Sequence, residues 1–149
     1  MEGESARLAR RWYDLFNGVD LDVIDEIVAP DFVSHEPGTG TAQRGPASVR
    51  SFFSWYRATF SGARWTIDDL MVAGDRVVVR GHGESTYAGD WHGIPASGQR
   101  VTESCINIFR ISGGKIREMW FEVSDLHVVY QLGAFPAREA SATNNGDSR

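Results

Sequence analysis

Apolar residues recur at helical spacing in the N-terminal part of the chain. A stripe at positions i, i+4, i+7 and i+8 predicts a helix over 5–18, with one face buried in a core: Leu8, Trp12, Leu15 and Phe16. A shorter helix is predicted over 21–28, before Pro30. A third is predicted over 46–60, because proline is favoured in the first turn of a helix. A short extended piece, 31–35, and a loop, 36–44, separate the last two helices.

The pattern changes to that of strands after residue 64. Four segments rich in β-branched and aromatic residues are expected to be strands: 65–73, 76–87, 100–112 and 115–123. Tight glycine-containing turns join two pairs of these segments, which favours antiparallel pairing. A closing helix is predicted from Asp125, with Gly133 in the position of a C-terminal cap. Helices, then strands, then a final helix predict an α+β fold.

Composition limits the classes of protein and partner. A chain of 149 residues is long enough for one domain with a substantial core, predicted over 1–135, and the polar segment 136–149 is predicted to be a disordered tail. The net charge of −5 argues against nucleic acid or an anionic membrane as a partner. No apolar run is long enough to cross a bilayer, and the N-terminus resembles no signal peptide. A cytoplasmic protein is therefore expected.

Four segments, taken in order, resemble the SnoaL-like polyketide cyclase family of the nuclear-transport-factor-2-like superfamily. The segments are SWYRATF at 54–60, HGIPASGQRV at 92–101, the strand–turn–strand stretch 109–116, and Gln-Leu-Gly at 131–133. Their order and spacing match the family from about Ser5 to Ala134. The resemblance implies a cone-shaped half-barrel, in which a curved antiparallel sheet packs on the N-terminal helices around a deep apolar pocket. It also implies a homodimer or homotetramer.

The same resemblance implies an activity and a type of substrate. Family cyclases act in antibiotic biosynthesis and close a ring of a hydrophobic polyketide by intramolecular aldol condensation. An aspartate takes a proton from carbon and later protonates the new alkoxide. The conjugated substrate itself holds the enolate charge, so neither a metal nor an organic cofactor is expected. The pocket folds the substrate into a reactive geometry and excludes water.

This chain departs from the family pattern at the position of that aspartate. Counting seven residues back from Gln131 leads to Ser124, and Asp125 is the next residue. We predict Asp125 as the catalytic base, although an aspartate in the first helical turn also complements the helix dipole. Ser124, which is also a suitable helix cap, and Asn107, which replaces a family histidine, are expected to polarise the substrate carbonyl.

Further candidates follow from strand alternation and from position next to loops. Glu103 shares a strand face with Cys105 and Asn107, so it is the alternative base, because a carboxylate facing an apolar cavity is costly unless it has a function or a partner. His35, at the end of the extended piece beside the loop expected at the pocket mouth, and His92, in the connection 89–97, are expected to assist the chemistry. Additional substrate contacts are expected from aromatic side chains: Tyr13, Trp55, Phe109 and Trp120. No spacing typical of a metal site occurs.

Two other classes of function remain open at this point. The same scaffold could support a cofactor-free hydroxylase or an epoxide hydrolase acting on a similar ligand, because altered polar residues in the pocket would accompany such a change. It could also be a non-catalytic binding protein for a small hydrophobic molecule, since Ser124 replaces the family aspartate. A fold alone does not choose among these functions.

Overall fold

The computed structural model describes residues 2–134. Helices and strands follow one another in this order: α1 (Glu4–Phe16), α2 (Val23–Ile27), β1 (Val28–His35), β2 (Ala42–Arg44), α3 (Gly45–Thr59), β3 (Phe60–Ala73), β4 (Arg76–Tyr87), β5 (Arg100–Ser112), β6 (Lys115–Val123) and α4 (Asp125–Gln131). The α+β prediction is confirmed. The segment 136–149 lies outside the described residues. Among those described, no helix is long and apolar enough to span a membrane.

The strands form one curved sheet in the order β2-β1-β6-β5-β4-β3. Pairing is antiparallel between sequence neighbours, but β1 pairs with β6 in parallel. The predicted antiparallel pairing is confirmed for the four segments expected to be strands, but the expectation of an antiparallel sheet fails at β1, which is parallel to β6. Turn residues predict only pairing between neighbours in sequence, whereas β1 reaches β6 from across the chain. Pro30 lies within β1, where its ladder to β6 is interrupted between Val28 and Val33, a place at which a residue without an N–H is tolerated.

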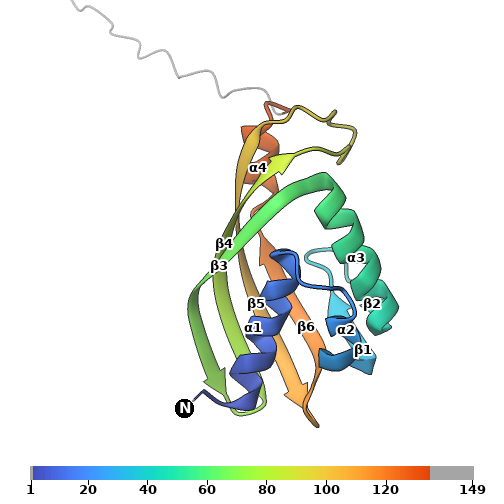
Figure 1. Cartoon of the computed structure of the whole chain (residues 1–149), viewed down its shortest axis with the longest axis vertical. Helices are drawn as coiled ribbons and strands as arrows, with labels where there is room; N and C mark the ends of the chain where they lie inside the picture. The colour runs from blue at the N-terminus through green and yellow to red at the C-terminus, as the bar shows by residue number, and fades with distance from the viewer. Residues whose placement is uncertain (1, 135–149) are drawn as a thin grey trace, which may run out of the picture.

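Helices α1 and α3 cover the concave face of the sheet (Figure 1). Trp12 of α1 is 2% exposed, and its ring lies within 6 Å of three other rings, those of Phe32, Phe53 and Phe109. These rings come from β1, α3 and β5. One side chain of the predicted stripe thus joins both helices to two strands, and burial of such aromatic surface is the main stabilising term.

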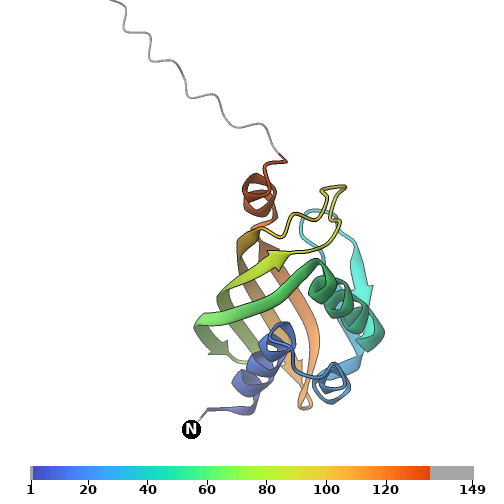
Figure 2. The same ribbon diagram turned by 45° about the horizontal axis from the view of Figure 1, so that its top comes forward.

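The sheet curves around the helices, as the turned view in Figure 2 shows. Strand β3 has two irregularities in its pairing with β4, between Ser61 and Arg64 and between Ile67 and Asp69. Such bulges bend a strand and increase its twist. Two glycines of β4 then allow bulky side chains to approach: a Cβ at Gly83 would lie 2.5 Å from the Trp65 ring, and one at Gly81 would lie 2.8 Å from the Tyr13 ring.

We therefore predict that Gly83→Ala destabilises the protein, because the added methyl overlaps the buried Trp65 indole. Overpacking of this kind costs about 1–3 kcal/mol. Chemical denaturation monitored by circular dichroism measures the free energy of unfolding. Glu84→Ala, at the neighbouring exposed position, is the control and should change stability by less than about 1 kcal/mol. Equal effects of the two substitutions would contradict the close approach.

Candidate active site

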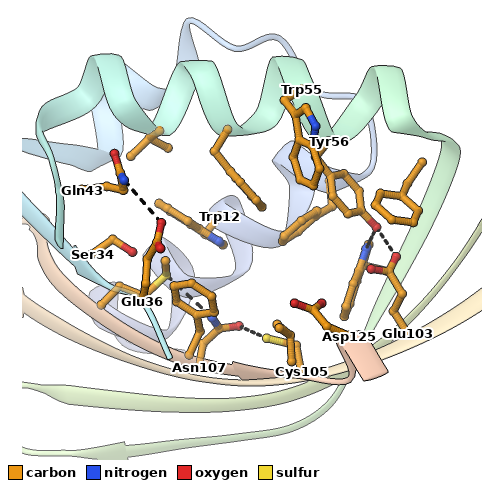
Figure 3. A pocket seen from close by; sticks show the side chains of 18 of the residues that line it. Trp12, Ser34, Glu36, Gln43, Trp55, Tyr56, Glu103, Cys105, Asn107 and Asp125 are labelled. Atoms are coloured by element: carbon orange, nitrogen blue, oxygen red, sulfur yellow. Dashed lines mark hydrogen bonds between the residues drawn. The ribbon is translucent and has the colours of Figure 1, made fainter. Parts of the chain in front are cut away.

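A cavity lies between the helices and the concave face of the sheet. Most of its lining is aromatic or aliphatic, and the lining residues come from every element except α2 and β4: Trp12, Phe16, Phe32, Ser34, Glu36, Gln43, Ser48, Val49, Phe52, Trp55, Tyr56, Phe60, Trp65, Trp91, Glu103, Ser104, Cys105, Asn107, Met119, Phe121, Val123 and Asp125. Figure 3 shows carboxyl groups at two ends, with Glu36 at one and Glu103 and Asp125 at the other, and with Trp12 and Asn107 between them. Such a concave apolar site with few polar groups is typical of small-molecule binding.

Glu103, on β5, forms a hydrogen-bonded chain at one end of the cavity. The Tyr56 hydroxyl donates to Glu103 Oε2 at 2.5 Å, and Trp65 Nε1 donates to the same hydroxyl at 2.9 Å. Burial is the main reason why the pKa of Glu103 is raised to about 7. The hydrogen bond from Tyr56 lowers this pKa, whereas the nearby charge of Asp125 raises it further. This carboxyl therefore carries a proton in a substantial fraction of molecules at neutral pH.

Asp125, the first residue of α4, directs its carboxyl into the cavity near Glu103 (Figure 3). The residue as a whole is exposed at the rim, but partial burial still raises the pKa of its carboxyl, while His92 acts in the opposite direction. Gln131 fixes the helix that carries it: its side-chain amide donates to Thr102 O at 2.8 Å and accepts from Thr102 N at 2.9 Å. The two carboxyls thus share one wall of the cavity.

Asn107 is a buried amide on β5, two positions from Cys105. Its Oδ1 accepts hydrogen bonds from the Tyr13 hydroxyl at 2.6 Å and from Cys105 Sγ at 3.2 Å. Its amide nitrogen makes only a 3.7 Å contact with Met119 Sδ, a weak acceptor. The bonds at Oδ1 therefore orient the amide so that Nδ2 is the group with donor capacity left for a bound ligand.

Four predicted site residues line this cavity: Asp125, Glu103, Asn107 and Trp55. They come from α4, β5 and α3. The alternation used to place Glu103, Cys105 and Asn107 on one inward face of β5 agrees with the structure, because all three line the cavity.

Two predicted residues, His35 and Trp120, lie outside the cavity lining. Strand alternation directs Phe32 and Ser34 of β1 inward and His35 to the opposite face. There His35 Nε2 lies 2.8 Å from Glu118 Oε1, and its ring stacks on Trp120 at a centroid distance of 5.1 Å. His35 therefore belongs to a hydrogen-bonded cluster on the convex face, not to the pocket mouth.

Ser124 and the remaining candidates also lie outside the lining. The Ser124 hydroxyl accepts from Ser104 N at 2.9 Å, so it binds the backbone of β5 and does not cap α4. Phe109 is fully buried in the core. Tyr13 acts on the site through Asn107, and His92, exposed in the loop between β4 and β5, acts through its charge on Asp125.

The structure adds functional candidates that the sequence did not indicate. Tyr56 is one of them: its position on the buried face of α3 is that of a core residue, yet it bonds Glu103. Glu36 and Gln43 fall in the predicted loop 36–44 and line the opposite end of the cavity. A polar residue in a glycine- and proline-containing loop is the only sequence signal for these two residues. In residues 2–134, no three His, Cys, Asp or Glu side chains gather as metal ligands would.

The fold and the cavity define an α+β half-barrel protein with an apolar cavity of the kind that is typical of small-molecule binding. A sequence model described as SnoaL-like polyketide cyclase matches residues 6–132, so this chain belongs to the SnoaL-like polyketide cyclase family. It is similar to nogalonic acid methyl ester cyclase of Streptomyces nogalater, with 26% identity over 110 residues, which are 69% of this chain and 78% of the relative.

Solved structures agree with this assignment. TsrD from Streptomyces laurentii is 29% identical, with a TM-score of 0.79 over 91% of this chain and 99% of its own. IdmH from Streptomyces antibioticus is 27% identical, with a TM-score of 0.78 over 88% of this chain and 99% of its own. The expected family and fold are therefore confirmed.

The raised pKa of Glu103 predicts a pH-dependent effect on stability. Between the ordinary value of 4.5 and about 7, the folded protein binds more protons than the unfolded chain, so this residue's contribution falls as pH rises. Glu103→Gln removes that loss. The free energy of unfolding of this variant minus that of wild type should therefore increase by up to about 3 kcal/mol when the pH is raised from 5 to 8. Each pKa unit is worth about 1.4 kcal/mol.

Denaturant titrations at several pH values measure this difference. Glu122→Gln, at an exposed position outside the cavity lining, is the control for the loss of a carboxyl charge. A difference for Glu103→Gln that did not vary with pH would mean that the carboxyl titrates like one in water.

Proposed function

We propose that the protein is a cofactor-independent cyclase that closes a ring of a hydrophobic polyketide by acid/base catalysis. The observation that carries this proposal is the pair of carboxyl groups, Asp125 and Glu103, on one wall of an otherwise aromatic cavity. Burial raises the pKa of both. Two carboxyls that differ in proton affinity can divide the roles of base and acid.

Asp125 is the base in this scheme. Its ionised carboxylate takes a proton from the carbon next to a substrate carbonyl, and the electron pair of that C–H bond moves into the conjugated system as an enolate. Asn107 Nδ2 supplies a hydrogen bond to the oxygen that bears the developing charge. Such preorganised donors act most strongly where water is excluded.

Glu103 is the acid. The enolate carbon attacks a second carbonyl carbon, a C–C bond forms, and the oxygen of that carbonyl becomes an alkoxide. The protonated Glu103 carboxyl donates its proton to this alkoxide, and Asp125 passes its proton to Glu103 directly or through solvent to complete the cycle. Tyr56 and Trp65 hold the Glu103 carboxyl in place through the hydrogen bonds described above.

The comparisons support this type of reaction. The Streptomyces nogalater relative is a cyclase of nogalonic acid methyl ester, and the family is that of the SnoaL-like polyketide cyclases. That relative's named substrate is therefore a suitable first assay compound. The aromatic lining of the cavity suits a planar, partly cyclised polyketide, because stacked rings stabilise such ligands.

The first prediction from this scheme concerns Asp125. Asp125→Asn removes the base while it preserves size and hydrogen bonding, so kcat should fall by about two orders of magnitude or more with little change in KM. Asp90→Asn, at an exposed aspartate in the loop between β4 and β5 outside the cavity lining, is the matched control. Comparable activity of both variants would exclude Asp125 as the base.

Cyclisation of nogalonic acid methyl ester, followed by absorbance and mass spectrometry, measures both rates. Tight binding of the ester by wild type without turnover would contradict the cyclase proposal and favour another reaction or a binding role.

The second prediction concerns the pH dependence. An acid must be protonated to act, so kcat should fall as pH rises through about 7, the pKa of Glu103. Glu103→Gln should lower kcat by about 100-fold at pH 6 and remove this basic limb. Tyr56→Phe removes a hydrogen bond that lowers this pKa, so it should move the limb to higher pH. A wild-type profile that is flat from pH 6 to pH 8 would argue against the role of Glu103.

A further inference from the structure

The cavity has a second polar end, which the proposed chemistry does not use. Glu36 follows β1, Gln43 lies in β2, and both line the cavity opposite the Asp125–Glu103 wall (Figure 3). Glu36 is half-buried. A carboxylate in such a position, facing aromatic surface, loses part of its hydration unless a partner replaces it.

Hydrogen bonds within the β1–β2 connection fix this carboxylate. Glu36 N donates to Thr41 O at 3.1 Å. The Thr41 hydroxyl donates to Glu36 Oε2 at 3.2 Å, and Gln43 Nε2 donates to Glu36 Oε1 at 3.3 Å. An ionised carboxylate has about four acceptor sites, so these two neutral donors leave acceptor capacity on both oxygens.

No cation neutralises the charge of Glu36 within the cavity. Its charged lining residues, among those that the structure describes, are Glu36, Glu103 and Asp125, and the lining contains no lysine, arginine or histidine. A ligand that occupies the cavity therefore meets the carboxylate of Glu36 at one end and that of Asp125 at the other, with an aromatic section between them. Like charges brought together in a site of reduced dielectric repel strongly.

We propose that Glu36, oriented by Gln43 and Thr41, is a specificity-determining residue that binds a hydrogen-bond donor on the end of the substrate remote from the reacting carbons. The group it selects is a hydroxyl or an ammonium, and a carboxylate at the same position is rejected. This inference rests on the proposed function only in placing the reaction at the opposite end, and it concerns binding, not turnover.

The test uses anthraquinones that carry one substituent at the same ring carbon: hydroxymethyl, aminomethyl, methoxymethyl or carboxylate. Four tryptophans line the cavity, so quenching of their fluorescence reports binding: Trp12, Trp55, Trp65 and Trp91. Wild type should bind the alcohol at least about tenfold more tightly than the carboxylate, and about threefold or more better than the methyl ether. Tighter binding of the aminomethyl compound than of the alcohol identifies an ammonium as the preferred donor.

Glu36→Gln isolates the contribution of this end from that of the catalytic end. The variant keeps the shape of the side chain, so the carboxylate ligand should gain about three- to tenfold in affinity and the alcohol should lose its advantage over the ether. Glu122→Gln, outside the cavity, is the matched control and should keep the wild-type order. An unchanged order in Glu36→Gln overturns the proposal.

The outcomes also separate this proposal from the catalytic one. Binding of the probes without any dependence on Glu36 overturns only the specificity role, because ring closure is not measured. Failure of every probe to bind overturns the planar aromatic ligand class, and with it both proposals. Loss of cyclase activity in Asp125→Asn with an unchanged preference among the probes supports both.

Discussion

The site depends on aromatic packing between the two long helices and the concave face of the sheet. The sheet curves so strongly that the helices do not fill the space on this face. Phe16 of α1 lies within 5 Å of the rings of Phe53, Tyr56 and Trp65, so one side chain joins α1 to α3 and β3. Interiors pack to nearly constant density, and flat rings on a curved face leave a gap where the face bends away. The cavity is that gap, and its aromatic walls are the exposed sides of the core.

The same packing restricts what polar groups in the cavity can do. The two polar groups on β5 are each held by a neighbour that is itself buried: Asn107 by Tyr13, and Glu103 by Tyr56, which Trp65 orients in turn. Burial raises the pKa of both tyrosines, which keeps them neutral donors. Catalytic groups need this kind of rotational restraint, because a displacement of about 1 Å lowers catalysis strongly.

Sequence patterns predicted where the helices and strands lie, but they predicted which side chains face the cavity only for the long strand β5. Residues on β5 were placed correctly because period-2 alternation relates them to one another. His35 was misplaced because its short strand gave too little pattern to decide its face, and the parallel partner that fixes that face, β6, lies far along the chain. Glu36 and Gln43 were missed for a related reason: a loop sequence carries no period, so nothing in it indicates the direction of a side chain.

The junction between β6 and α4 explains why the side chain of Asp125, and not that of Ser124, lines the cavity. Ser124 bonds both to the N–H and to the carbonyl of Ser104, so its side chain turns toward the backbone of β5. Gln131 binds Thr102 through two further hydrogen bonds and fixes the other end of the helix. With both ends of α4 attached to β5, the next residue, Asp125, is the one whose side chain faces the cavity. A count along the sequence identifies the position of the junction, but the hydrogen bonds to β5 decide which side chain enters the site.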